Sequence, residues 1–283
     1  MEMRFAAVTL GSLALLFMKF PLFTLTLVCL AAAAGAQDPS APRLPDLSPS
    51  PIYTLTDAEK ADGWKLLFDG KDPSGLRGLT YSDFVKRGWK IDHGTLFCEK
   101  DVKHMGMVTG GHLITADQYT DFEFLWEWKM SVSGKSGIMY FAGGTREKPV
   151  GFVYSLIDDT HHPDGLKGGP IRRTGALYKM LPPIEDKKLE EPGQWNKGRL
   201  VVQGNHVEHW LNEARVLEFE LGTPALQKAI NASGIKGGPF FGRKFKSALV
   251  ILDEGEEVEF RNLRIRPLTP PAVAPAVVAP VAK

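Results

Sequence analysis

The sequence contains very little cysteine, which limits how the fold can be held together. Cys29 and Cys98 are the only cysteines among 283 residues. Cys29 lies in a predicted leader, so the mature chain would keep one cysteine and could form no intramolecular disulfide. The fold must therefore depend on its hydrophobic core. Cys98 follows Leu96 and Phe97, and we expect a buried small side chain rather than a nucleophile.

The chain also lacks an excess of either charge. Lysine and arginine together number 34, aspartate and glutamate 33, and the formal net charge is +1. Such a balance creates no long-range field that would attract nucleic acid or an anionic membrane. We therefore expect no nucleic-acid partner, and contact with a membrane only through an uncleaved leader.

Standard catalytic motifs are missing as well. The sequence has no phosphate-binding loop, no Gly-x-Ser-x-Gly, no His-Glu-x-x-His and no paired-cysteine metal site. We expect no organic cofactor. Any chemistry must come from side chains that the fold gathers from separate segments.

The N-terminus has the pattern of a cleavable secretion signal. Lys19 precedes an uncharged apolar run that ends in Ala34-Gly35-Ala36, whose small residues suit a cleavage site. A second apolar run precedes Met18, so translation could begin at Met18 rather than at Met1. A membrane anchor and a lipid anchor at Cys29 are the alternatives. We expect an exported protein, either periplasmic or at the cell surface.

The proline, alanine and valine content divides the chain after the leader into a linker, a folded domain and a tail. Prolines crowd residues 37–55, and residues 269–283 consist almost wholly of proline, alanine and valine. Neither stretch can hold a regular element. The predicted organisation is a leader over 1–36, a linker over 37–55, one folded domain over 56–268 and a disordered tail over 269–283.

Within the predicted domain, short aromatic and β-branched segments alternate with glycine turns, which is typical of all-β proteins. In the clearest strand, residues 122–130, large apolar side chains alternate with mostly charged ones, which indicates a sheet buried on one face. Capping residues predict short helices after Thr56 and over Pro224–Ile230. The predicted fold is a two-sheet antiparallel jelly-roll sandwich.

Acidic and imidazole side chains gather in one predicted loop. Asp158 and Asp159 end a strand-like segment, and His161 and His162 follow them. Farther along, residues 172–178 add two arginines and a tyrosine. These are the groups that general acid/base or metal chemistry uses. The alternative is a solvated loop in which the aspartates cap turns.

A second polar cluster lies on a predicted strand over residues 206–211. Alternation places His206, Glu208 and Trp210 on one face. They could share a ligand with the loop that holds Asp158, and Trp210 could stack on a sugar ring. The alternative is an ordinary cross-strand ion pair on a solvated face.

These stretches also carry a family resemblance that extends over residues 63–268. The matching segments are Gly63 to Lys71, Phe124 to Lys129, Ser136-Gly137-Ile138, Asp158-Asp159, His162-Pro163-Asp164, Thr174 to Tyr178, Gly193 to Asn196, Gly204 to Asn212 and Phe260 to Leu268. In order and spacing the chain resembles the 3-keto-disaccharide hydrolase family.

The resemblance implies a concanavalin A-like jelly roll and an activity on glycosides whose glucose is oxidised at carbon 3, as a lyase, hydratase or net hydrolase. Such a site needs a base, a proton donor and an enolate stabiliser, which is a divalent cation or cationic side chains. We assign the base or metal ligands to Asp158, Asp159 and His162, with Asp158 and His162 as the metal pair. Arg172 and Lys129 would steady the enolate. Substrate contacts go to Glu127, Tyr178, His206, Glu208 and Trp210.

Some polar positions differ from the family pattern. Val153 stands where a glutamate is common, Glu254 where a histidine is common, and Lys135 where an asparagine is common, while Phe141 replaces a basic residue. These differences leave two other hypotheses open. One is a carbohydrate-binding sandwich domain without catalysis, and the other is a structural or partner-binding surface protein.

Overall fold

The computed structural model describes residues 53–85, 88–100, 111–145 and 148–269. All of these belong to one compact unit, Asp46–Lys283. The predicted leader, most of the linker and nearly all of the tail lie outside the described residues, so those assignments stay predictions. In the described part of the chain, no helix is long and apolar enough to cross a membrane.

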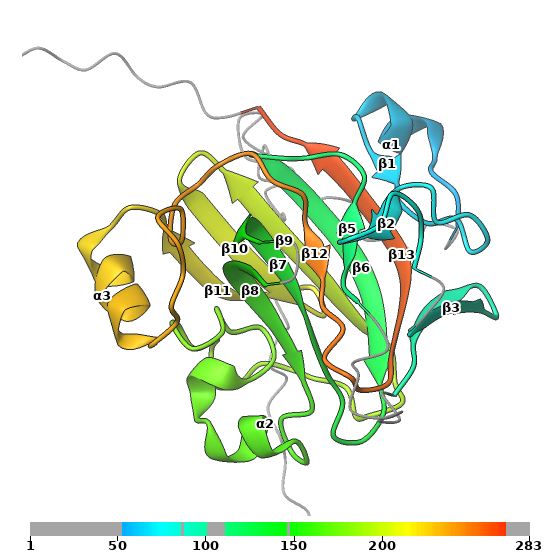
Figure 1. Ribbon diagram of the computed structural model, residues 1–283. Helices are drawn as coiled ribbons and strands as arrows, with labels where there is room; N and C mark the ends of the chain where they lie inside the picture. Colours follow the sequence, from blue (N-terminus) through cyan, green and yellow to red (C-terminus); the bar gives the residue numbers. More distant parts are fainter. Residues whose placement is uncertain (1–52, 86–87, 101–110, 146–147, 270–283) are drawn as a thin grey trace, which may run out of the picture. The chain divides into compact units, whose positions relative to one another are not determined.

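The described residues of this unit form two antiparallel sheets, as the sequence predicts (Figure 1). The larger sheet has eight strands: β11 (Ala214–Glu220), β10 (His206–Leu211), β9 (Asn196–Gln203), β6 (Phe122–Met130), β13 (Val258–Pro267), β4 (Thr95–Cys98) and β3 (Trp89–Asp92), with β1 (Lys65–Leu66) paired to β13. The five-stranded sheet has the order β2 (Leu76–Gly78), β5 (Leu113–Thr115), β12 (Val250–Ile251), β7 (Lys135–Gly144) and β8 (Pro149–Ile157). The fold is a jelly-roll sandwich.

The core lies between the sheets and explains the alternation in β6. Phe122, Phe124, Trp126, Trp128 and Met130 are all at most 5% exposed and belong to one hydrophobic cluster. Aromatic side chains stack there on one another, which adds directional contacts to the burial of apolar area. The period-2 pattern therefore identifies the inward face of this strand correctly.

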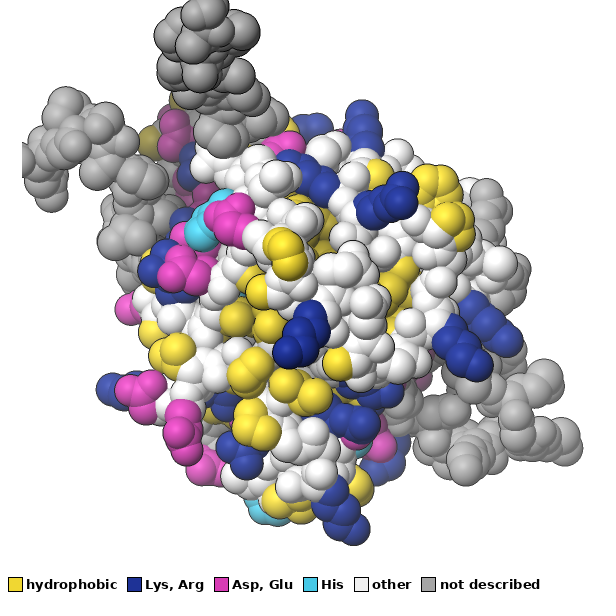
Figure 2. Space-filling view, turned by 90° about the vertical axis from the view of Figure 1, so that its left-hand side faces the viewer, with side chains coloured by type: hydrophobic (Ala, Val, Ile, Leu, Met, Phe, Trp, Pro, Cys, Tyr) yellow, Lys and Arg dark blue, Asp and Glu magenta, His cyan; other side chains and the backbone are white. Residues whose placement is uncertain are grey.

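The outward face of β6 differs from the solvated face that the pattern predicts. The Glu123 side chain is only 2% exposed, because Arg199 and Arg266 cover its two carboxylate oxygens at 2.6 Å and 2.6 Å. Ion pairs of this kind extend over much of the outer face of the eight-stranded sheet. Figure 2 shows acidic and basic side chains side by side along the left edge of one face of the molecule.

Short helices flank the sheets. The predicted capping box at Thr56 begins α1 (Asp57–Ala61), and Thr223 caps α3 (Pro224–Ala232). Two further elements, α2 (Pro163–Lys167) and the 3₁₀ helix η1 (Pro170–Arg172), form where the sequence predicts only an irregular loop. The helix α2 carries Asp164, and η1 carries Arg172.

Gly198 leaves room for one of the largest side chains of the core, that of Trp126. A Cβ atom added at Gly198 would lie 2.2 Å from ring atoms of Trp126, which is fully buried. We expect Gly198→Ala to lower the free energy of unfolding by about 1–3 kcal/mol through overpacking. In urea titrations Gly111→Ala is the control, since a Cβ there meets nothing within 4 Å. Equal midpoints for the two variants would contradict this explanation.

Candidate functional site

Asp158 follows β8 directly and holds the turn together. Its side chain is only 2% exposed. Its oxygens accept hydrogen bonds from the backbone N–H groups of Ser133, Thr160 and His161 and from the Thr160 hydroxyl. Burial acts to raise the pKa of Asp158, but these bonds outweigh it and lower the pKa to about 2. The carboxylate therefore serves as a turn cap, rather than as the predicted base or metal ligand.

Asp159 is engaged in a similar way. It accepts the Thr174 N–H at 2.8 Å and forms an ion pair with Lys187, whose side chain is 7% exposed. Both aspartates line a pocket of about 190 Å³ at the ends of β6 and β8. The other lining residues are Trp128, Met130, Ile157, Thr160, Lys187, Leu189, Glu190, Glu191, Pro192, Gln194 and Asn196. The lining residues between positions 187 and 192 lie outside the segments that carry the family resemblance.

His162 is the N-cap of α2. Its Nδ1 accepts the Asp164 N–H at 3.0 Å, so the proton of the neutral ring belongs on Nε2. Burial, followed by the nearby Lys135 ammonium, lowers the pKa of His162. With the cap intact, neither ring nitrogen offers a free electron pair. The pair of Asp158 and His162 therefore does not fit a metal ion, and His162 is better suited to donate a hydrogen bond.

Beside this turn, Asp164 accepts contacts from three donors that come from separate segments of the chain. Lys135 at the start of β7 donates at 3.2 Å, the Tyr178 hydroxyl donates at 2.6 Å, and Arg172 in η1 forms an ion pair. Burial opposes the charge, but the Tyr178, Arg172 and Lys135 donors hold the pKa of Asp164 well below its ordinary range. Glu254 lies 3.6 Å from the Lys135 ammonium. We call these five residues the Asp164 cluster.

The Asp164 cluster lies on the outer side of the five-stranded sheet. Tyr178 reaches it because residues 174–178 run along the edge of β8, where the Tyr178 N–H bonds the Val153 carbonyl at 3.0 Å. Ile114, Met139, Val250 and Leu252 form a second hydrophobic cluster on this side, against which Val153 packs. The side chains of Lys135, Arg172 and Glu254 are 20%, 32% and 34% exposed, so a ligand can reach them.

The protonation states suit a site that handles negative charge. Burial lowers the pKa of Lys135, but Glu254, Tyr178 and Asp164 raise it above its ordinary value overall. Burial and the hydrogen bond to Asp164 raise the pKa of Tyr178. At neutral pH, the site therefore presents two cations and a phenolic proton.

Five other predicted site residues do not lie at the Asp164 cluster. They are Glu127, Lys129, His206, Glu208 and Trp210. Glu127 and Lys129 lie on the outer face of the eight-stranded sheet, where Arg261 and Glu259 pair with them at 2.8 Å and 2.9 Å. The ring of Trp195 lies beneath Arg261 and Lys129 there.

His206, Glu208 and Trp210 also lie on that face, because Val207, His209 and Leu211 point into the core. The Trp210 indole donates to Glu208 at 2.7 Å, and Arg199 covers the Trp210 ring. Glu208 pairs with Val201, five residues along β9 from the pocket residue Asn196, or about 17 Å away along the strand. The prediction that His206 and Glu208 share a ligand with Asp158 and His162 is therefore wrong.

Sequence reasoning missed Lys135, Asp164 and Glu254 as members of one cluster. Asp164 belongs to the polar stretch, and Lys135 and Glu254 are two positions that differ from the family pattern. The signal in the sequence was that several positions that differ from the family pattern fall on the same face of one sheet. Of the predicted site residues, Arg172 and Tyr178 join this cluster.

Comparisons with known proteins agree with this architecture. A family model described as "3-keto-alpha-glucoside-1,2-lyase-like domain" matches residues 63–266. A protein of Bacteroides thetaiotaomicron named 3-keto-disaccharide hydrolase is 31% identical over 232 residues, which cover 74% of this chain and 79% of that protein.

Two solved structures superpose on this chain over most of their length. A candidate glycosyl hydrolase from Parabacteroides distasonis superposes with a TM-score of 0.66 at 29% identity, covering 76% of this chain and 99% of that one. A second candidate glycosyl hydrolase from the same organism has a TM-score of 0.55 at 26% identity, with 72% and 99% covered.

Proposed function

The chain belongs to the family of 3-keto-α-glucoside-1,2-lyase-like domains, and from this premise we propose that it cleaves glycosides whose glucose unit carries a ketone at carbon 3. The observation that supports this activity best is the Asp164 cluster. It combines two cations, a phenol and a solvent-accessible carboxylate on one sheet face.

The ketone determines what the site must do. It acidifies the proton on carbon 2, so that a base can remove this proton and leave an enolate. The enolate expels the aglycone from carbon 1 without an oxocarbenium ion. Water then adds across the resulting enone, and the net reaction is hydrolysis. Each proton transfer by a positioned side chain accounts for roughly 10²–10⁴-fold in rate.

Glu254 is the base in this proposal. Among the described residues its nearest cation is Lys135, at 3.6 Å, which is too long for a hydrogen bond, and the Glu254 side chain is 34% exposed. Asp164 is less suitable, because three donors occupy it and hold its pKa low. Glu254 stands at the position where the family pattern commonly has a histidine, so this chain would keep a base of another type there.

Lys135 and Arg172 stabilise the enolate oxygen. Both are already oriented by Asp164, so they need little reorganisation when negative charge develops. They supply the positive charge that a divalent cation would otherwise provide. Tyr178, with its raised pKa, keeps its proton at neutral pH and can deliver it to the departing oxygen.

The substitution at Val153 favours a second candidate function. Its side chain is apolar where a carboxylate is common in the family, and it packs against the second hydrophobic cluster. A site without that carboxylate could bind a sugar without cleaving it. A carbohydrate-binding domain predicts saturable binding and no product.

Export is the remaining part of the proposal. The leader pattern over residues 1–36 supports a periplasmic or surface location, where oligosaccharide fragments would be the substrates.

The assay compares a nitrophenyl 3-keto-glucoside with the parent nitrophenyl glucoside. The proposed activity releases nitrophenol from the ketone and not from the parent, because only the ketone acidifies carbon 2. Equal release from both substrates would contradict elimination. Saturable binding of the ketone with no release would instead support the binding domain.

Tyr178→Phe tests the proton donor. We expect the rate to fall by about 10²-fold for a 3-keto-glucoside with an alkyl aglycone, because an alkoxide leaves poorly without protonation. Nitrophenolate is a good leaving group, so its release should change little. Tyr81→Phe is the matched control, since Tyr81 is 61% exposed. Equal losses for both aglycones would show that Tyr178 has another role.

A further inference from the structure

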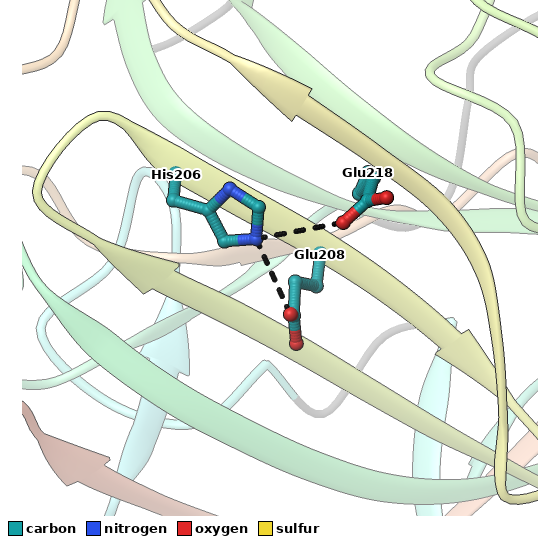
Figure 3. Close-up of side chains that lie close together, drawn as sticks. All are labelled: His206, Glu208 and Glu218. Atoms are coloured by element: carbon teal, nitrogen blue, oxygen red, sulfur yellow. Dashed lines mark hydrogen bonds and ion pairs between the residues drawn. The ribbon is translucent and has the colours of Figure 1, made fainter. Parts of the chain in front are cut away.

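The geometry points to a Zn²⁺ site on the outer face of the eight-stranded sheet, formed by His206, Glu208 and Glu218 (Figure 3). The first two residues lie on β10 and the third on β11. Each offers one ligand atom, and the three atoms all lie within 4.8 Å of one another. This site is separate from the Asp164 cluster and does not depend on the proposed activity.

The distances suit a small divalent ion. The Nε2 atom of His206 lies 3.2 Å from Glu208 Oε1 and 3.8 Å from Glu218 Oε2. Zinc bonds of about 2.0–2.2 Å to nitrogen and oxygen place tetrahedral ligand atoms roughly 3.4 Å apart. One imidazole and two carboxylates match zinc, whereas magnesium and calcium prefer oxygen ligands alone. Water would complete the coordination.

Two neighbouring side chains already orient the ligands. The other ring nitrogen of His206, Nδ1, lies 2.7 Å from Glu220 Oε1, which fixes the proton on Nδ1 and leaves Nε2 for a metal. The Trp210 indole donates to Glu208 Oε2 at 2.7 Å, which turns Oε1 toward His206. A carboxylate behind the histidine is the arrangement usual for metal-binding histidines.

The charge balance also favours a cation. With His206 neutral, the carboxylates of Glu208, Glu218 and Glu220 face one guanidinium among the described residues, that of Arg215. Its Nη1 lies 3.2 Å from Glu208 Oε1 and 2.7 Å from Glu218 Oε2, so Arg215 competes for the same two oxygens. The Arg215 side chain is 42% exposed and can rotate into solvent when a metal enters.

Calorimetric titration of the full, tag-free chain with ZnCl₂ tests the site. We expect saturable binding at one site, with excess Mg²⁺ or Ca²⁺ failing to compete. Glu220→Gln removes the neighbour that orients a ligand and should weaken the affinity by roughly 10–100-fold. His206→Ala removes a ligand itself and should weaken the affinity by at least as much. Arg215→Ala should tighten it. Glu213→Gln, at the turn of the same hairpin, is the matched control and should change nothing.

Three results would overturn the proposal: no saturable binding below about 1 mM, an unchanged affinity in His206→Ala, or an equal loss in Glu213→Gln. Circular dichroism of each variant without metal distinguishes lost ligands from lost folding. If His206→Ala is misfolded, His206→Gln, which preserves polarity, must show the same loss of affinity for the site to stand.

Discussion

Replacing Glu254 with glutamine is expected to lower kcat/KM on a 3-keto-glucoside by roughly 10²–10⁴-fold. The amide has nearly the shape of the carboxylate but cannot accept the proton from carbon 2. Lys135 lies 3.6 Å away and is also held by Asp164, so the cluster should keep its arrangement when the charge is lost. The measurement is the rate of aglycone release under subsaturating substrate.

A matched control makes this test specific. Glu213→Gln removes a similar carboxylate from an exposed ion pair with Lys197 and should leave the rate unchanged. If the glutamine variant keeps its rate, another group removes the proton.

The second large effect concerns the pH dependence of stability, through His209. The ring is fully buried between the sheets, 3.0 Å from the Gly175 carbonyl and 2.9 Å from the Tyr140 hydroxyl. The neutral ring satisfies both partners by donating from Nδ1 and accepting at Nε2. Burial lowers the pKa of His209 from 6.5 to about 4, and the bond to Gly175 only partly opposes this.

The sign follows from which state binds the proton. Between pH 6.5 and about 4, the unfolded chain is protonated at this residue and the folded chain is not, so stability falls as the pH falls. The shift corresponds to about 3 kcal/mol, lost in full below about pH 4. Urea titrations of the wild type and of His209→Gln at several pH values measure it.

Glutamine can still donate and accept but does not titrate. His209→Gln should be less stable than the wild type at pH 7.5, by about 1–3 kcal/mol if one hydrogen bond is lost. Its stability should then decline less steeply toward pH 4. Parallel curves for the two proteins would show that His209 is not the source of the acid sensitivity. Gly175 and Tyr178 lie in the same segment, residues 174–178. The comparison of His209→Gln with the wild type therefore also shows how far the His209 hydrogen bond holds that segment against the core.

Local patterns predicted most of the fold. The strand at residues 122–130 is predictable because alternation reports directly on which side chains face the core. The helices α1 and α3 are predictable because threonine caps mark their starts. The helix α2 was missed because it is only five residues long and its cap is the imidazole of His162.

The site was predicted less well, for a physical reason. Alternation places a side chain on one face of a strand but does not say which sheet the strand joins. Lys135 and Asp164 are 29 residues apart, and their contact depends on how β7, β8 and α2 come together. Likewise, composition does not show which carboxylate is available to a ligand. The oxygens of Asp158 accept hydrogen bonds within the turn, whereas Glu254 stays accessible.

The proposed reaction requires a base that removes the proton from carbon 2 of a 3-keto-glycoside. Running the reaction in D₂O and examining the released 3-keto-glucose by mass spectrometry and proton NMR tests it directly. The mechanism predicts one deuterium at carbon 2, beyond the exchange that free 3-keto-glucose shows in the same buffer without protein. Product that keeps its original hydrogen at carbon 2 would contradict the mechanism.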